Sequence, residues 1–148
     1  MGLNPGRKPR KLVDMAVEPA KFQYVPTEES IETIWDISLG ACDLYVREAR
    51  LGGLIVDYAL NQRWATHDEV ADGIQLDVAR IDCCHSEVHR HQFYKAGQED
   101  PKYEVLVSLK GCASDAEAQD MVNASYQESY DRMINNWEDY LERWERGA

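Results

Sequence analysis

The chain has 148 residues, 44% of them hydrophobic, and a formal net charge of −11. This length fits one domain with a real hydrophobic core, and so acidic a protein is unsuited to general binding of DNA or of any other phosphate backbone. No run approaches the roughly 20 apolar residues that span a bilayer. The chain has four cysteines but neither a CxxC pair nor a secretory signal, which indicates reduced thiols. We therefore expect a cytoplasmic protein with no membrane contact.

Residues 1–26 are predicted to form a basic, largely irregular N-terminal arm, and residues 27–148 a single domain. The arm holds four prolines, which interrupt regular elements, and its first 21 residues carry five Lys/Arg against two acids. The plain interpretation is a mobile, solubilising terminus. The alternative is that the arm contacts RNA, an acidic partner or the acidic body of the protein itself.

A short helix is predicted after the arm. Thr27 is a suitable N-cap, and acids follow it in the first turn, where they suit the helix dipole. Ile31, Ile34 and Trp35 then fall on one helical face, which indicates about three turns. We place the end of this helix at Gly40, and its continuation to about residue 50 is the alternative.

Five strands are expected, over residues 44–49, 54–60, 74–82, 88–94 and 103–109. The first two flank Gly52-Gly53, a turn signal between two β-prone runs. The second of these runs alternates apolar and more polar residues, which is the period of a strand with one buried face. The third and fourth strands form another hairpin, with Cys83-Cys84-His85 at its turn.

A long helix is predicted at the C-terminus. Ser114 and Glu117 form a capping box, and about 30 helical residues follow. One face carries an aromatic stripe at spacings of four and three, made of Tyr126, Tyr130, Met133, Trp137, Tyr140 and Trp144. We expect this stripe to pack on the sheet, although a homodimer seam formed by the helix is the alternative.

These elements together predict an α+β fold, in which a mostly antiparallel sheet of about five strands packs against a long C-terminal helix, with a short N-terminal helix. Candidate chemistry is confined to the second hairpin, because His85, His89 and His91 gather within seven residues there and imidazole titrates near neutrality. On a strand, His89 and His91 share a face with Phe93, and Asp82 lies on the facing strand.

Three uses of this hairpin are physically sensible. His89 and His91, together with a third His or Asp, could bind zinc or another transition metal, and His85, His89 and His91 are the ligands we expect. Alternatively, the histidines could act on a phosphodiester as general acid and base, with Asp82 as orienting acceptor and Arg80 or Arg90 stabilising the charged transition state. Finally, the histidines could lie under the helix as hydrogen-bonded, inert packing.

Two segments carry a resemblance: Gly53-Leu54-Ile55-Val56-Asp57-Tyr58-Ala59-Leu60, and the run from Val78 to His91 that contains Arg80, Asp82, His85, His89 and His91. Over residues 53–94 the chain resembles small uncharacterised domains of actinobacteria and their phages, and more loosely the toxin component of TumE-type toxin–antitoxin pairs. The resemblance implies a toxin-like protein that acts on RNA and pairs with an antitoxin-like protein, with those five residues as its catalytic positions. The competing hypotheses are a non-catalytic binding or oligomerisation module that uses the C-terminal helix face, and a metal-binding protein.

Overall fold

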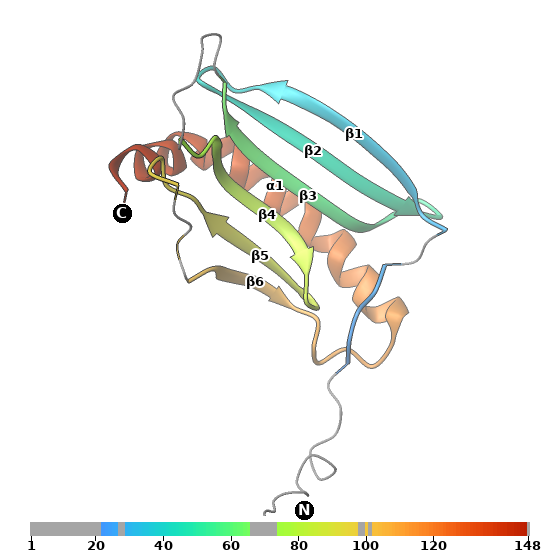
Figure 1. Ribbon diagram of the computed structural model, residues 1–148. Coiled ribbons are helices and arrows are strands. Elements are labelled where there is room, and N and C mark those ends of the chain that lie inside the picture. Colours follow the sequence, from blue (N-terminus) through green and yellow to red (C-terminus); the bar gives the residue numbers. More distant parts are fainter. Residues whose placement is uncertain (1–21, 27–28, 66–73, 98–99, 101, 148) are drawn as a thin grey trace, which may run out of the picture.

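The computed structural model describes residues 22–26, 29–65, 74–97, 100 and 102–147. These form one antiparallel sheet in the order β1-β2-β3-β4-β5-β6 and one helix, α1, which crosses a single face of the sheet (Figure 1). The elements are β1 Ile31–Ser38, β2 Cys42–Leu51, β3 Leu54–Trp64, β4 Asp77–Cys84, β5 Glu87–Gln92, β6 Glu104–Ser108 and α1 Asp115–Arg146. The predicted α+β fold is confirmed, with six strands in place of about five.

The predicted short N-terminal helix is wrong, because that segment is the edge strand β1. It pairs with β2 along its whole length, from Ile31 opposite Arg50 to Ser38 opposite Asp43. Three isoleucines and one threonine lie in β1, and these β-branched residues favour strands. Pairing with the otherwise bare edge of β2 therefore outweighs the helical spacing, which is a weak preference in isolation.

Both predicted hairpins are present. Gly52 and Gly53, with φ of 58° and 89°, turn the chain between β2 and β3. His85 and Ser86 turn it between β4 and β5 with φ of 55° and 60°, which is the left-handed pattern of a tight two-residue hairpin turn. Tyr24 N–H donates to Ser86 Oγ at 2.7 Å and Leu109 N–H donates to Ser86 O at 2.9 Å, so two other segments hold this turn.

The capping box predicted for the long helix is confirmed. Ser114 is the N-cap of α1, and its Oγ accepts a hydrogen bond from Glu117 N–H at 3.2 Å. The Glu117 carboxylate in turn accepts from Ala113 N–H at 2.9 Å. At the other end Gly147, with φ of 80°, donates its N–H to Arg143 O, so both ends of the helix are closed by local hydrogen bonds.

The core lies between α1 and the sheet, and the aromatic stripe of the helix faces it, as predicted. Met133, Tyr140 and Trp144 are buried. Trp144 stacks on Trp64 of β3 with ring centroids 5.5 Å apart, and its indole N–H donates to Gln75 O. This face of the helix packs on the same chain's sheet, and a homodimer through the helix stays a prediction.

Polar side chains of β3 also fasten the helix to the sheet. Tyr58 Oη lies 2.8 Å from Ser125 Oγ and 3.0 Å from Ser129 Oγ. Gln62, fully buried, donates to Trp137 O at 2.9 Å. These contacts satisfy polar groups inside the core, where an unpaired group is costly, and they fix which face of β3 looks at the helix.

Part of the predicted N-terminal arm belongs to the domain. Residues 22–26 have no regular secondary structure, but Tyr24 is buried and its hydroxyl donates to Val56 O at 2.6 Å. Residues 1–21, which include most of the basic arm, lie outside the described residues. Among the helices of the described chain, none has the length and apolar character needed to cross a membrane.

Candidate functional site

The histidine cluster lies on the face of the sheet opposite α1, called the open face here. In β5 the alternate residues Arg90 and Gln92 face the helix: Gln92 donates to Tyr140 O at 3.1 Å and the Arg90 guanidinium lies 4.3 Å from the centroid of the Tyr140 ring. Alternation along a strand then places His89 and His91 on the open face. The interpretation that placed these histidines under the helix is therefore wrong.

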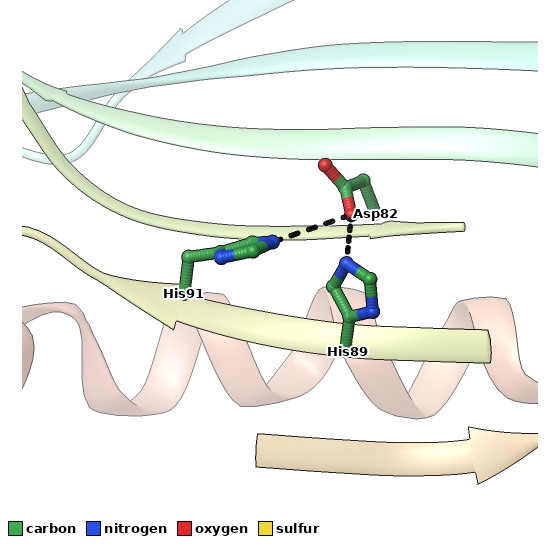
Figure 2. Close-up of side chains that lie close together, drawn as sticks. All are labelled: Asp82, His89 and His91. Atoms are coloured by element: carbon green, nitrogen blue, oxygen red, sulfur yellow. Dashed lines mark ion pairs between the residues drawn. The ribbon is translucent and has the colours of Figure 1, made fainter. Parts of the chain in front are cut away.

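Asp82, His89 and His91 converge on one point of the open face (Figure 2). Asp82 of β4 is the direct cross-strand partner of His89. Its Oδ1 lies 3.0 Å from His89 Nε2 and 3.9 Å from His91 Nε2, and one donor atom from each of the three residues lies within 4.8 Å of the others. The two imidazole rings are almost perpendicular, with centroids 4.6 Å apart. Two nitrogens and one oxygen from two adjacent strands therefore lie close together.

The hydrogen bonding of this cluster is incomplete. Asp82 Oδ1 is buried and accepts no hydrogen bond of acceptable geometry, despite its closeness to both imidazoles. His89 Nδ1 is also buried and has no hydrogen-bond partner of acceptable geometry, and the His89 side chain is only 3% exposed. Buried polar atoms without such bonds are uncommon in folded proteins and call for an explanation.

Charged side chains surround the three donors. Arg80 Nε lies 3.1 Å from the second carboxylate oxygen of Asp82. Glu87 Oε1 lies 3.5 Å from His89 Nδ1, and its other oxygen is 3.2 Å from Lys110 Nζ. Burial raises the pKa of Glu87, but the Lys110 ammonium and then His89 outweigh it, so the pKa is lowered overall. Glu87 is thus an ionised acceptor behind His89.

Two aromatic rings border the cluster, Tyr103 next to β6 and Phe93 at the end of β5. The Tyr103 ring centroid lies 4.8 Å from that of His89 and 5.7 Å from that of His91. Phe93 stacks on His91 at 6.2 Å, and the Arg80 guanidinium lies 5.1 Å from the centroid of the Phe93 ring. Phe93 is buried, whereas Tyr103 is 48% exposed, so Tyr103 is the aromatic side chain that a solute meets at the rim.

The structure brings together four of the five predicted catalytic positions. Arg80, Asp82, His89 and His91 adjoin one another, whereas His85 is exposed at the hairpin turn and is not one of the three grouped donors. Of the two kinds of third ligand that the sequence allowed, a histidine or an aspartate, the structure has Asp82 beside His89 and His91 and not the expected His85. The fourth histidine of the chain, His67, lies outside the described residues.

Other groups considered from the sequence do not join the cluster. Arg90 faces α1 and pairs with Glu104 at 3.3 Å. Cys83 and Cys84 are free thiols outside the group of donors. Burial, and then the nearby Asp57 carboxylate, raise the pKa of the Cys83 thiol well above its usual range, so this cysteine is a poor source of thiolate.

Two residues of the site were missed from the sequence. Glu87 shares the period-two face of His89 and His91, so the same alternation would have found it. Tyr103 precedes β6, and its place beside the histidines depends on a β5–β6 register that shifts between Val88 and His89. That shift left no local signal from which Tyr103 could have been placed.

Comparison with protein-family models, with curated proteins and with solved structures found no match. The resemblance to uncharacterised actinobacterial domains and to TumE-type toxins therefore stays a prediction. What the protein does has to be inferred from the cluster itself.

Proposed function

We propose that Asp82, His89 and His91 bind one divalent transition-metal ion, and that this centre is catalytic. The convergence of two imidazole nitrogens on a buried carboxylate oxygen that lacks a hydrogen bond carries the proposal. A tetrahedral ion at bond lengths of about 2.0–2.2 Å separates its ligand atoms by about 3.4 Å. The Asp82-to-histidine separations of 3.0 and 3.9 Å lie on either side of that value.

The surrounding charges support a metal in this place. Ligating histidines usually direct their second ring nitrogen to a carboxylate, and ligating carboxylates are themselves held by a donor. Glu87 lies behind His89 Nδ1 and Arg80 beside Asp82 Oδ2. Two imidazoles with one carboxylate suit zinc, iron and neighbouring transition metals, whereas magnesium and calcium prefer oxygen ligands alone.

Three protein ligands leave coordination positions for water and substrate, which is the arrangement of catalytic rather than structural sites. A metal there would lower the pKa of bound water and polarise a phosphoryl oxygen. The proposed reaction is hydrolysis of an RNA phosphodiester: a bond from water oxygen to phosphorus forms, the bond to one ribose oxygen breaks, and that oxygen takes a water proton. Arg80 is the cation available to bind the phosphate, and the resemblance to toxins supports RNA as the substrate.

Metal titration of the tag-free protein after chelation tests the centre. We expect calorimetry with Zn²⁺ to give about one ion per chain. His89→Ala and Asp82→Asn each remove a proposed ligand. They should therefore weaken zinc binding by more than roughly 10- to 100-fold, which is the cost of losing a side chain that only supports a ligand. His85→Ala is the matched control, since it removes a histidine of the same hairpin outside the cluster, and it should leave the affinity unchanged. Equal losses in all three variants, or no binding by the wild type, would contradict the proposal.

Metal-free acid–base catalysis on the same RNA phosphodiester is the second candidate. It is favoured by the 3.0 Å approach of His89 Nε2 to Asp82, which resembles an imidazole oriented by a carboxylate, with a second imidazole beside it. Cleavage of single-stranded RNA that persists in excess chelator would select this mechanism. Cleavage that stops with chelator and returns with metal would select the metal centre.

Bacterial growth tests the toxin-like role. We expect induction of the wild type to arrest growth, and the His89→Ala/His91→Ala variant to leave growth normal at matched soluble expression. His85→Ala should still arrest growth. Unimpaired growth with the wild type would count against a toxin, without bearing on metal binding.

A further inference from the structure

We infer that Tyr103 is the platform on which an unpaired base of the RNA substrate stacks, next to the histidine cluster. The inference rests on the proposed function and gives its substrate as single-stranded RNA. Tyr103 is more exposed than the rings it contacts: 48% of the residue is accessible, against 3% and 15% of the His89 and His91 side chains. One side of the tyrosine ring therefore covers imidazoles while much of the remainder meets solvent.

The position of Tyr103 matches a substrate that has both a planar and an anionic part. Its ring centroid is 4.8 Å from that of His89, so a base stacked on the outer side of the ring lies one aromatic ring away from the histidines. Arg80, on the far side of the donors, carries the positive charge for the phosphate and has a side chain 32% exposed. Val105, the cross-strand partner of His89 and 47% exposed, extends the apolar rim next to Tyr103.

The charge of the protein makes stacking the expected source of affinity. Nucleic-acid binding by basic proteins gains from the release of counterions, one for each phosphate neutralised. A chain of net charge −11 gains little in this way. Stacking of a base on an aromatic ring is far less dependent on charge, and every base has a face that can stack. We therefore expect weak salt dependence and a need for an exposed aromatic ring at the site.

Stacking also requires that the base be unpaired. In double-stranded RNA the bases are stacked on one another and the grooves offer mainly shape and backbone groups. An aromatic side chain on the open face of a sheet can reach a base only when that base is splayed out of a helix. We therefore expect single-stranded RNA to bind and the matching duplex not to bind.

Fluorescence anisotropy with a labelled 2′-O-methyl RNA of about eight nucleotides, long enough for a small single-strand site, tests the inference. The methyl group prevents attack by the 2′-hydroxyl, and excess chelator in the assay prevents attack by metal-activated water. Tyr103→Ala should weaken binding roughly 5- to 150-fold, the loss of one stacked base. Tyr103→Phe should retain binding, because the ring and not the hydroxyl is used. Raising the salt concentration should change the affinity much less than it does for basic RNA-binding proteins.

Tyr45→Ala is the matched control. Tyr45 is also on the open face and 39% exposed, and it lies in the same cross-strand row as His91 through Asn61 and Arg80. Three strand spacings, about 14 Å, separate it from His91. Its replacement should leave RNA binding unchanged. A loss equal to that of Tyr103→Ala would overturn the inference.

The remaining outcomes separate the inference from the proposed function, because metal stoichiometry is measured on every variant. If Tyr103→Ala binds RNA as tightly as the wild type, or the duplex binds as well as the single strand, the stacking role is refuted and the metal centre stands. If the wild type binds no RNA, the inference fails and metal titration alone decides the centre. Loss of both metal and RNA in Tyr103→Ala would also overturn it, since the ring would then only support the histidines.

Discussion

Replacement of Tyr58 by Phe tests how the helix is fastened to the sheet that carries the site. Tyr58 is fully buried, and its hydroxyl lies between Ser125 and Ser129 of α1. Ser125 donates its own proton to Val122 O at 2.8 Å. The consistent arrangement is therefore that Tyr58 donates to Ser125 Oγ and accepts from Ser129. Burial raises the pKa of Tyr58 to about 12, so the phenol keeps this proton at neutral pH.

The cost of Tyr58→Phe follows from these bonds. Removing one buried partner leaves other groups unsatisfied, at about 1–3 kcal/mol. Ser129 can recover part of this by donating to the carbonyl of the preceding helical turn, so we expect a loss of about 1–2 kcal/mol in the free energy of unfolding. For a chain of this size that lowers Tm by about 2–8 °C.

Urea and thermal unfolding followed by circular dichroism measure the change. Tyr45→Phe, at an exposed tyrosine, is the control and should stay within about 0.5 kcal/mol of the wild type. In the background Ser125→Ala/Ser129→Ala, the additional loss from Tyr58→Phe should shrink, because the partners are already gone. A Tyr58→Phe loss below about 0.5 kcal/mol, or full additivity in the triple variant, would refute the hydrogen-bonded arrangement.

Two further predictions concern titratable groups. Alkylation of the native protein should modify the exposed Cys84 before Cys83, whose pKa is raised by burial and then by Asp57; peptide mapping that found Cys83 modified first would contradict this. Glu87 has a lowered pKa in the folded state, so its stabilising contribution is complete above its unfolded value of 4.5 and is lost as pH falls through the folded pKa. Glu87→Gln should therefore be less stable than the wild type at neutral pH, and this difference in stability should narrow in acid. Urea unfolding from neutral to acidic pH measures the difference. A difference that widened in acid would contradict the prediction.

Local signals explain why most of the fold was predictable. The Gly52-Gly53 turn, the alternation in β3 and the Ser114 cap each determine structure within a few residues. β1 was missed because its conformation depends on pairing with the adjoining β2, and the spacing of residues within 31–38 carries no signal of that pairing. Ile31, Ile34 and Trp35 satisfy a helical spacing by coincidence, and the adjoining strand decides against it.

The sequence predicted which residues form the site better than it predicted on which face of the sheet the site lies. Alternation correctly grouped His89 with His91 and placed Asp82 opposite. It did not tell which side of β5 meets the helix, because both sides of that strand carry polar residues: Arg90 and Gln92 on one, the histidines on the other. Only the packing of Arg90 and Gln92 against Tyr140 settles the choice, and that contact joins segments far apart in sequence.

The most direct test of the proposed metal centre is anomalous X-ray diffraction from crystals of the tag-free protein grown with a low concentration of Zn²⁺, with data on both sides of the zinc absorption edge. We expect one strong peak within about 2.0–2.2 Å of Asp82 Oδ1, His89 Nε2 and His91 Nε2. This peak should disappear in the His89→Ala variant and persist in His85→Ala. A zinc peak at His85 instead, or none at the cluster while the crystals hold zinc elsewhere, would contradict it.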